Sequence, residues 1–572
     1  MAQHISPGVY TKIIDLSEFV QNVPSTIGFI CIISEHGPDN QLIFTNARDF
    51  YLDFGRPDIT YAKKAFGQGP YVADSFLKQS DSLYVVRCLP TDAAYSNLIL
   101  MAERAGEYGA DGTASAVATS EAGVNTLNEL STLLTNTYET GSEDTCCVFY
   151  GVGRGDWYDR FRVEITKPAN TTVQTDKPDI YVMDVYEKQN DVNPDTGADQ
   201  FEIIETYMVS FLSTRLDDDG ESMWIEDIVN RYSRHLNCIA DEVACLAAVE
   251  GSCEFDIPFL DGALNLENGS TGSLFDANGA VTTTVGDSIL SLAYTGDITN
   301  PLTGQALESV IDTEDHYFNI VFDGGYSTNV KRNIVELTRD LRQDCIAIID
   351  NGDNVNYQAA YDSRSESGGD TYGINTRYAA IYEPYSKIFD KFTGRYLWMT
   401  PVYHMANIIP YTDNIAELWY APAGFNRATI AQIQELRFSP NLSQRDQFYL
   451  KQINPIVKFN VGFTVYGQLT SQVRPTALQD LNIMRLILYI KRALEQFCRF
   501  YIFELNDTAT WGAISNNISA FLKTVQDRRG LYSFGVTVGA SEYDIKAKRI
   551  QANITLNPTR VVEQIHLNFF VV

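Results

Sequence analysis

The sequence predicts a multidomain protein of mixed α/β class, and two observations support this prediction. First, its 572 residues are too many for one hydrophobic core and correspond to about three or four domains. Second, the second half of the chain alternates helical stripes of apolar residues with short apolar runs typical of buried strands. Hydrophobic residues make up 45% and charged residues 20% of the chain, which indicates a folded, soluble protein.

The net charge of −30 is concentrated in one block. Residues 91–320 contain 41 Asp and Glu but 10 Lys and Arg, and the rest of the chain contains 32 acidic and 33 basic residues. Residues 481–572 are basic, with 11 Lys and Arg against 7 Asp and Glu. This acidic block is either an ordinary surface domain exposed to solvent, or the water-facing side of a protein whose basic part faces a partner.

The acidic balance also excludes some partners. Nucleic acid and anionic membranes both select Lys and Arg, so neither is expected as the main partner. No run of about 18 apolar residues occurs, so we expect no membrane-spanning segment. The start of the chain lacks a basic segment followed by an apolar one, so we expect no secretory signal and a protein that leaves its cell only by lysis.

Residues 91–320 have the pattern of one or two inserted, β-rich domains. Gly, Ser, Thr, Asn and Asp are frequent in 265–279 and 287–304, as in loops between strands. Strands are predicted over 146–150, 161–165 and 180–186. A helix is predicted over 222–236 because apolar residues recur at every fourth position, namely Trp224, Ile228, Tyr232 and Leu236.

The second half is more regular. A helix over 330–341, with Val330, Ile334, Leu337 and Leu341 on one stripe, precedes a buried strand over 345–350. Two long helices are predicted over 478–500 and 511–529, and Gly530 is placed to cap the second. Strands over 531–538 and 547–556 follow them.

The sequence contains few signs of catalysis, so an enzyme is not expected. None of the six histidines belongs to an HExxH motif, and no GxxxxGK[ST] phosphate loop occurs. The glycines of 151–155 have the wrong spacing for a dinucleotide-binding turn, and Arg154-Gly155-Asp156 is interpreted as structural. The nine cysteines form no CxxC pair, which predicts reduced thiols, no metal and a reducing compartment. We therefore expect no cofactor.

One segment resembles a calcium-binding loop. Five of its residues match ligand positions 1, 3, 5, 9 and 12 of such a loop, namely Asp191, Asn193, Asp195, Asp199 and Glu202. However, the glycine required at position 6 is replaced by Thr196, and flanking helices are not evident. An acidic hairpin tip has the same pattern and is the favoured interpretation.

Both ends of the sequence have apolar residues that a strand could use. Near the start these are Ile5, Val9, Ile13 and Leu16, and near the end they are Ile565, Leu567, Phe569 and Val571. The last four alternate with His566, Asn568, Phe570 and Val572, which indicates a strand. An unpaired edge strand ending in Phe-Phe-Val-Val promotes aggregation, so the strand either pairs within its own subunit or is donated to a neighbour's sheet.

Several motifs, in a fixed order, resemble those of the contractile tail sheath proteins of bacteriophages. The motifs are SPGVYTKIIDLS at 6–17, the run 27–37, APAG at 421–424, INPI at 453–456, VYG at 465–467 and FELNDTATW at 503–511. The resemblance covers about 6–89 and 321–572, whereas 91–320 matches poorly. This sequence departs from the family at Tyr466, where Trp is frequent, and at Tyr158-Asp159, where Gly-Asn is common.

The resemblance implies a structural protein of the virion that is assembled in the host cytoplasm. Sheath proteins of this kind form six-subunit rings stacked around a tail tube, and the sheath shortens from a high-energy extended state to drive the tube through the host envelope. Other sheath subunits, the tube, the baseplate and the tail terminator are the implied partners.

The resemblance also implies a division of the chain. We expect an N-terminal arm at 1–22, an α/β sandwich core at 23–90 plus 321–556, outer domains at 91–320 and a C-terminal arm at 557–572. Lys523, Arg528 and Arg529 are candidates to face the tube, although ordinary favourable placement at a helix C-terminus is the favoured explanation. Two alternatives stay open, namely a phage-derived contractile particle of the tailocin type and an acidic, calcium-binding surface protein or adhesin.

Overall fold

A computed structural model describes residues 26–57, 68–103, 116–134, 143–169, 179–192, 199–217, 219–250, 265–275, 282–365, 371 and 373–563. These residues form two compact units. One unit contains 26–416 with 422–473, and the other contains 417–421 with the described part of 474–572. Within the described residues, no helix is both long and apolar enough to cross a bilayer.

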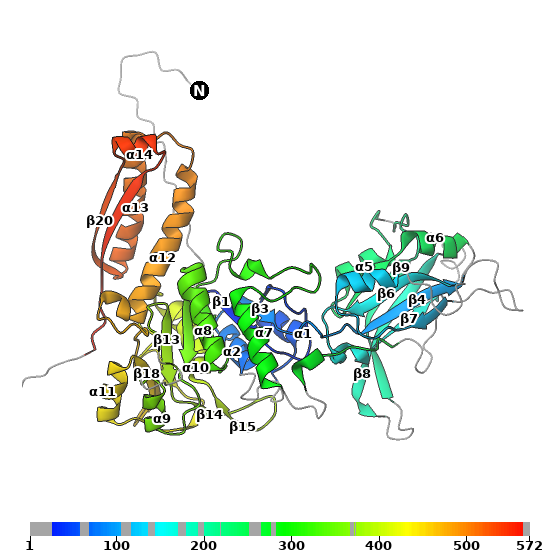
Figure 1. Ribbon diagram of the computed structural model, residues 1–572, viewed down its shortest axis with the longest axis horizontal. Coiled ribbons are helices and arrows are strands. Elements are labelled where there is room, and N and C mark those ends of the chain that lie inside the picture. The colour runs from blue at the N-terminus through cyan, green and yellow to red at the C-terminus, as the bar shows by residue number, and fades with distance from the viewer. Residues whose placement is uncertain are drawn as a thin grey trace, which may run out of the picture. The chain divides into compact units, whose positions relative to one another are not determined.

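The larger unit is built on a nine-stranded sheet in the order β16-β19-β18-β13-β12-β11-β1-β3-β2 (Figure 1). Its central strands pair in parallel, and they are β1 (Gly28–Ile32), β3 (Leu83–Arg87), β11 (Ile320–Phe322), β12 (Ile346–Asp350), β13 (Ala379–Glu383) and β18 (Ile453–Phe459). Antiparallel strands complete its edges, namely β2 (Ile43–Thr45), β16 (Thr429–Ile430) and β19 (Gly462–Val465). Because β1 pairs with both β3 and β11, the chain returns to the sheet centre after more than 200 residues elsewhere.

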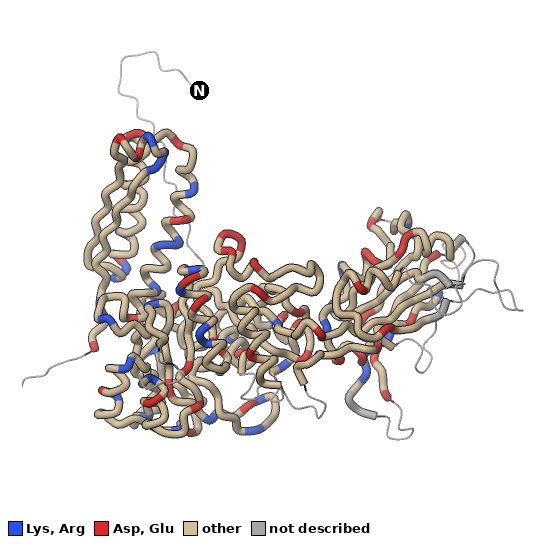
Figure 2. Tube along the Cα trace, in the orientation of Figure 1, with Lys and Arg blue, Asp and Glu red and all other residues tan. Residues whose placement is uncertain are grey.

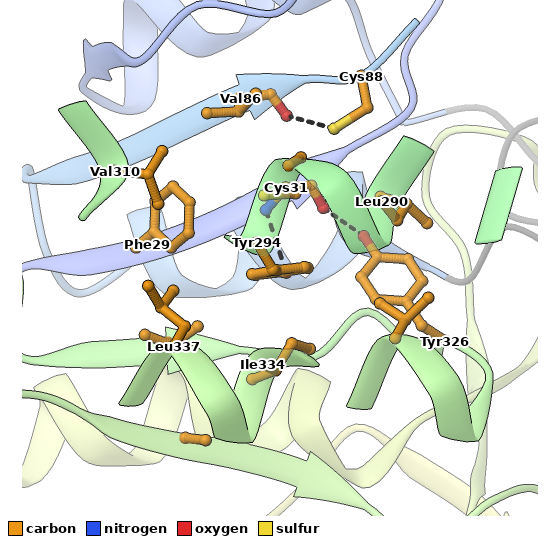
Figure 3. Packing of buried hydrophobic residues seen from close by; sticks show 14 of the residues in the cluster. Phe29, Cys31, Val86, Cys88, Leu290, Tyr294, Val310, Tyr326, Ile334 and Leu337 are labelled. Atoms are coloured by element: carbon orange, nitrogen blue, oxygen red, sulfur yellow. Dashed lines mark hydrogen bonds between the residues drawn. The ribbon is translucent and has the colours of Figure 1, made fainter. Parts of the chain in front are cut away.

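Helices cover both faces of this sheet. The helices α2 (Gly69–Leu77) and α10 (Pro401–Ile415) pack together on one face, and α7 (Thr283–Thr295) and α8 (Thr328–Glu336) pack on the other. Phe29 and Cys31 of β1 point toward Tyr294 of α7 and Ile334 of α8 (Figure 3). The Tyr294 hydroxyl accepts a hydrogen bond from the Cys31 amide at 3.1 Å and donates one to the Phe322 carbonyl at 2.8 Å. The Tyr294 hydroxyl therefore both accepts and donates a hydrogen bond inside this buried core.

Smaller elements complete the unit around this sheet. They are α1 (Ala47–Phe54), α9 (Tyr357–Asp362), α11 (Leu442–Leu450) and a three-stranded sheet of β14 (Ser386–Phe389), β15 (Tyr396–Met399) and β17 (Ile433–Leu436).

The acidic block forms two further sheets. The first has the order β10-β6-β4-β5 and consists of β4 (Asn97–Glu103), β5 (Ala116–Thr119), β6 (Glu143–Gly151) and β10 (Leu236–Ala240). The second consists of β7 (Phe161–Thr166), β8 (Ile180–Val192) and β9 (Asp199–Ser210). Phe149, Phe161 and Met183 belong to one buried cluster shared by both sheets. Beside these sheets lie the helices α3 (Leu127–Leu133), α5 (Ile225–Tyr232) and α6 (Glu242–Glu250), whereas α7, which is also within 91–320, packs on the central sheet.

The smaller unit packs two long helices against a β-hairpin. Its elements are α12 (Leu481–Cys498), α13 (Thr508–Asp527), β20 (Leu531–Gly539), α14 (Glu542–Lys546) and β21 (Gln551–Pro558). Helix α13 begins where the Asp507 side chain accepts a hydrogen bond from the Thr510 amide at 2.9 Å, an N-cap. Ile518, Leu522 and Val525 form its buried stripe. Lys and Arg recur along α12 and at α14 (Figure 2).

The mixed α/β class and the long helices are confirmed, but the predicted helix over 222–236 is wrong at both ends. Helix α5 covers only Ile225–Tyr232, and its buried residues are Ile225 and Val229, whereas Tyr232 is exposed. Leu236 belongs to β10 because it pairs with Gly151 of β6. Pairing with a distant strand has overridden the local helical pattern.

A second difference concerns the predicted helix over 330–341. Helix α8 ends at Glu336, and Leu337–Arg342 continues as a π-helix. Its wider turn leaves Leu341 exposed and places Arg342 inside, where it pairs with Asp344 at 3.0 Å. The predicted strand over 547–556 begins later, at Gln551, because α14 ends at Lys546 and residues 547–550 form the connection to the strand.

Candidate assembly surfaces

The hairpin of the smaller unit has one apolar face and two open edges. Residues pair in the register Phe534 with Leu556 and Val536 with Ile554. These four side chains pack on the core of α12 and α13 but are only half-buried. Among the described residues, neither β20 nor β21 pairs with a third strand. Within the described residues, both outer edges of the hairpin therefore lack a partner strand, and such edges are the usual template for an added strand.

The segments predicted to be donated strands lie outside the described residues. This holds for all eight predicted arm residues, namely Ile5, Val9, Ile13, Leu16, Ile565, Leu567, Phe569 and Val571. The structure thus describes a hairpin to which strands could be added, and both the donor segments and their pairing stay predictions.

The basic cluster lies at the C-terminal end of α13. Lys523 pairs with Asp527 at 3.0 Å, and Arg528 pairs with Glu417 at 3.4 Å. All three basic side chains are exposed. Arg529, and not Gly530, takes the left-handed position, with φ of 68°. The prediction that Gly530 is the conformational cap is therefore wrong by one residue. A glycine is still needed at 530, because a Cβ there would lie 2.7 Å from Val525 Cγ1.

The segment resembling a calcium loop connects β8 to β9. Its flanking elements are strands, as in the acidic-hairpin interpretation, and not the helices of an EF-hand. Asp199 pairs with Lys188 at 2.5 Å, and Glu202 accepts a hydrogen bond from Gln189 at 3.2 Å. Asn193 and Asp195 lie outside the described residues. Nowhere in the described part of the chain do three His, Cys, Asp or Glu side chains converge as a metal site requires.

The Arg154-Gly155-Asp156 tripeptide is buried at its arginine. The Arg154 guanidinium donates to Asp39 Oδ2 through Nε at 2.8 Å and Nη2 at 2.7 Å. The Arg154 amide donates to Asp39 Oδ1 at 2.8 Å. Arg154 follows β6 and Asp39 follows β1, so this pair joins the inserted sheets to the central sheet. The structure supports the structural interpretation of the tripeptide.

A buried charge cluster at the carboxyl edge of the central sheet was not predicted. Asp323, Asp350 and Glu383 follow or end the adjacent parallel strands β11, β12 and β13. Lys331 Nζ lies 2.7 Å from Asp350 Oδ1 and 3.7 Å from Asp323 Oδ2. Asp350 Oδ2 also accepts hydrogen bonds from Thr400 at 2.7 Å and Tyr385 at 3.0 Å. The sequence does contain a signal for this cluster, because each carboxylate follows or ends an apolar run. The carboxyl ends of parallel strands meet at one edge of a sheet, so such carboxylates are brought together there.

Burial and charge push the pKa values in this cluster apart. Burial raises the pKa of Asp323 to about 7, although Lys331 opposes the shift. Burial, with the Asp350 charge, also raises the pKa of Glu383. Against the effect of burial, the ion pair with Lys331 lowers the pKa of Asp350, and Asp350 and Asp323 raise the pKa of Lys331. Lys331 and Asp350 therefore form the charged pair, and burial favours the neutral form of Glu383.

The raised pKa of Asp323 predicts a pH-dependent stability. In the unfolded chain Asp323 loses its proton near its ordinary pKa of 3.8, but in the folded chain it keeps the proton until about pH 7. The folded state binds more protons in this window, so its contribution to stability falls as the pH rises from about 4 to 7. Measured against the Asp323→Asn variant, the free energy of unfolding of the wild type should fall by up to about 1.4 kcal/mol per pH unit.

Urea unfolding of both proteins at pH 5, 6, 7 and 8 measures this difference. Glu383→Gln is a second test, because burial also raises the pKa of Glu383, so the wild type should likewise lose stability relative to this variant as the pH rises. Parallel curves for the wild type and Asp323→Asn would contradict the prediction.

The comparisons with known proteins agree with the resemblance. Residues 474–571 match the family described as phage tail sheath C-terminal domain. A tail sheath protein of Vibrio phage KVP40 is 28% identical over 289 residues, which are 46% of this chain and 43% of that protein. The tail sheath protein of Enterobacteria phage T4 is 26% identical over 263 residues, 42% of this chain and 39% of that protein. The chain thus spans less than half the length of these curated relatives.

A solved structure extends the likeness to most of the fold. The sheath tail protein from Listeria innocua covers 95% of this chain and 93% of its own, with a TM-score of 0.55 and 11% identity. At that identity the likeness concerns the fold alone. The resemblance to contractile phage tail sheath proteins, made from the motifs, is confirmed.

Proposed function

We propose that this chain is the sheath subunit of a contractile phage tail. In this role it polymerises as stacked six-subunit rings around the tail tube and contracts from a metastable extended state to drive the tube through the host envelope. Other copies of the chain, the tube, the baseplate and the tail terminator are its partners in the virion. The proposed inner core comprises 23–90 and 321–556 together with α7, which packs on the central sheet, and the two sheets formed by 91–320 face outward.

The observation that carries the proposal is the hairpin with two open edges. Each edge can accept a strand, and the sequence offers two candidate strands at 1–22 and 557–572. An added strand making about six backbone hydrogen bonds at about 0.5–1.5 kcal/mol each contributes several kcal/mol per link. Two links per subunit make separation unlikely, because both must break together. Subunits linked in this way stay connected while other contacts rearrange.

Contraction then requires no nucleotide. The sequence has no phosphate-binding loop, so the work must come from the lattice itself, as a rigid-body change between two packings of the same subunits. A heterologous contact that does not close on itself generates the helical polymer.

Removing either arm is expected to abolish polymers of sheath length. Deletion of 1–22 and deletion of 563–572 should each leave a folded protein, because neither removes a residue of a described helix or strand. Each deletion should remove one of the two links. Negative-stain electron microscopy of the purified proteins measures the result.

A matched pair of variants tests the strand itself. Serine at Ile565, Leu567, Phe569 and Val571 should prevent assembly, because these residues would lie on the apolar face of the hairpin. Serine at His566, Asn568, Phe570 and Val572 changes the opposite face and should have a smaller effect. Sheath-length polymers from both arm deletions would refute the proposal.

The basic cluster is proposed to contact the tube. Reversing Lys523, Arg528 and Arg529 to Glu should weaken assembly on purified tubes, and the defect should be largest at low salt, because exposed charges are screened within about 10 Å at 0.1 M salt. Reversal of Lys188, Arg231 and Arg234, which are exposed in the acidic block, is the control. Co-sedimentation at 20 and 300 mM salt measures binding, and unchanged binding of the first variant at 20 mM refutes this contact.

The tailocin alternative shares this chemistry and differs only in delivering no genome. The adhesin alternative predicts monomers that bind calcium tightly at Asp191–Glu202. Calorimetry with calcium, beside electron microscopy of the same sample, separates it from the sheath proposal.

A further inference from the structure

The loop between α12 and α13 exposes an unusual number of apolar side chains. Phe503 is fully exposed, and Phe500, Ile502 and Leu505 are 70%, 60% and 76% exposed. At the same end of the unit, Tyr543 and Ile545 of α14 are also exposed (Figure 1). The carbonyl of Arg549, just before β21, accepts a hydrogen bond from Asn506 of the loop at 3.2 Å. These six residues, here called the tip patch, thus adjoin the start of β21; they are Phe500, Ile502, Phe503, Leu505, Tyr543 and Ile545.

The backbone at Phe503 is strained, and hydrogen bonds on both sides keep the exposed side chain in place. Its φ of 75° is left-handed, which is unfavourable for a bulky residue and is normally left to Gly or Asn. Hydrogen bonds fix the loop on both sides, from Asn517 to the Tyr501 hydroxyl at 2.9 Å and from the Trp511 indole to Asn506 at 2.7 Å. Strain of this kind persists where the surrounding structure enforces it, typically at sites of interaction. An exposed aromatic on a rigid support is also the usual form of an interface anchor.

The position of the tip patch relative to the hairpin indicates what covers it. Strand β20 runs toward α14, and β21 starts beside α14 and runs away from it. A strand added antiparallel to the open edge of β21 therefore runs toward the tip patch, and its last residues reach it. An extended segment rises about 3.3 Å per residue, so the nine residues 564–572 have the same length as the nine residues of β20 and can cover the hairpin from end to end. In that arrangement Phe569, Phe570, Val571 and Val572 lie at the tip.

We infer that the tip patch is the docking site for residues 569–572 of a second copy of this chain, with Phe503 as the anchor. The inference rests on the proposed strand donation and extends it, because it gives the donated strand a direction and a fixed register. Backbone pairing alone leaves a strand free to slip, whereas an aromatic anchor at one end selects a single register. The link then depends on side chains of the tip patch as well as on the hairpin edge.

Photo-crosslinking in the full-length chain tests this contact. Benzoyl-phenylalanine replaces Phe503, and polymers are assembled from equal amounts of light and heavy-isotope chains before irradiation and mass spectrometry. The expected result is a mixed light–heavy crosslink to residues 569–572. Crosslinks confined to one chain, crosslinks to other segments, or no crosslink in polymers that do form would each overturn the inference.

A substitution provides an independent test. Phe503→Asn relieves the left-handed strain, so the urea midpoint of unfolding should be unchanged or higher, while the protein concentration needed for polymers should rise at least tenfold. Val355→Ser removes an exposed apolar residue elsewhere and should change that concentration less than twofold. Assembly of Phe503→Asn at the wild-type concentration overturns the inference. If the unmodified chain forms no polymers at all, the proposed function itself fails, and the two failures are thereby distinguished.

Discussion

Lys331→Met is expected to lower the free energy of unfolding by about 3–5 kcal/mol at pH 7, the range seen when one partner of a buried ion pair is removed. Methionine preserves the length of the side chain but leaves Asp350 charged and buried without its cation, 2.7 Å away in the wild type. The hydrogen bonds from Thr400 and Tyr385 satisfy Asp350 Oδ2 but do not neutralise it. Urea unfolding followed by tryptophan fluorescence measures the loss.

The loss should also depend on pH. In the wild type the ion pair with Lys331 lowers the pKa of Asp350, whereas without Lys331 burial raises it. Asp350 of the variant therefore becomes protonated as the pH falls from 7 to 5, and the variant should lose less stability at pH 5 than at pH 7. The double variant Lys331→Met with Asp350→Asn should recover part of the stability. The exposed pair of Lys491 with Glu495 is the control, and Lys491→Met should lose less than about 1 kcal/mol. A loss below that level for Lys331→Met would contradict the charged-pair assignment.

Arg154→Met is the second change with a large expected effect, again about 3–5 kcal/mol. Among the described residues, it leaves Asp39, which is 1% exposed, with the Arg154 backbone amide as the one donor to its side chain. The guanidinium also donates to the carbonyls of Thr91 and Ala93, both at 3.3 Å, so the segment at 91–93 and the segment of Asp39 lose a common partner. Thermal unfolding at pH 7 measures the effect.

The control for this variant lies six residues further along the chain. Arg160 pairs with Glu187 at 3.3 Å, and both side chains are about 30% exposed. Arg160→Met should therefore lose less than about 1 kcal/mol. Equal losses at Arg154 and Arg160 would show that the burial of the Asp39 pair is not what stabilises it. A double-mutant cycle with Asp39→Asn measures the coupling directly.

The parts of the fold that could be predicted are those with a local pattern. Helices α12 and α13 follow from apolar residues repeated every three or four positions, and β12 from a continuous apolar run. The helix over 222–236 could not be bounded, because its end depends on Leu236 pairing with Gly151, far away in the sequence. The π-helix at Leu337–Arg342 was missed because the sequence pattern is that of an ordinary helix.

The candidate assembly surfaces divide in the same way. The alternation at 565–572 predicts a strand, but whether a strand has a partner depends on the neighbours that the fold brings to it. Asp39 and Arg154 are 115 residues apart, and no pattern in either segment indicates that the other will neutralise it. Similarly, Phe503 is part of a recognised motif, yet its full exposure is visible only in the structure.

By itself, the sequence determined the mixed α/β class, the acidic block at 91–320 and the resemblance to tail sheath proteins, because these depend on composition and on residues near one another in the chain. Only the tertiary structure decided which charges are buried, which hairpin edges are open and which aromatic faces solvent. The physical reason is that burial and edge pairing are set by contacts between segments often more than 100 residues apart, and a local pattern carries no information on which distant segment arrives.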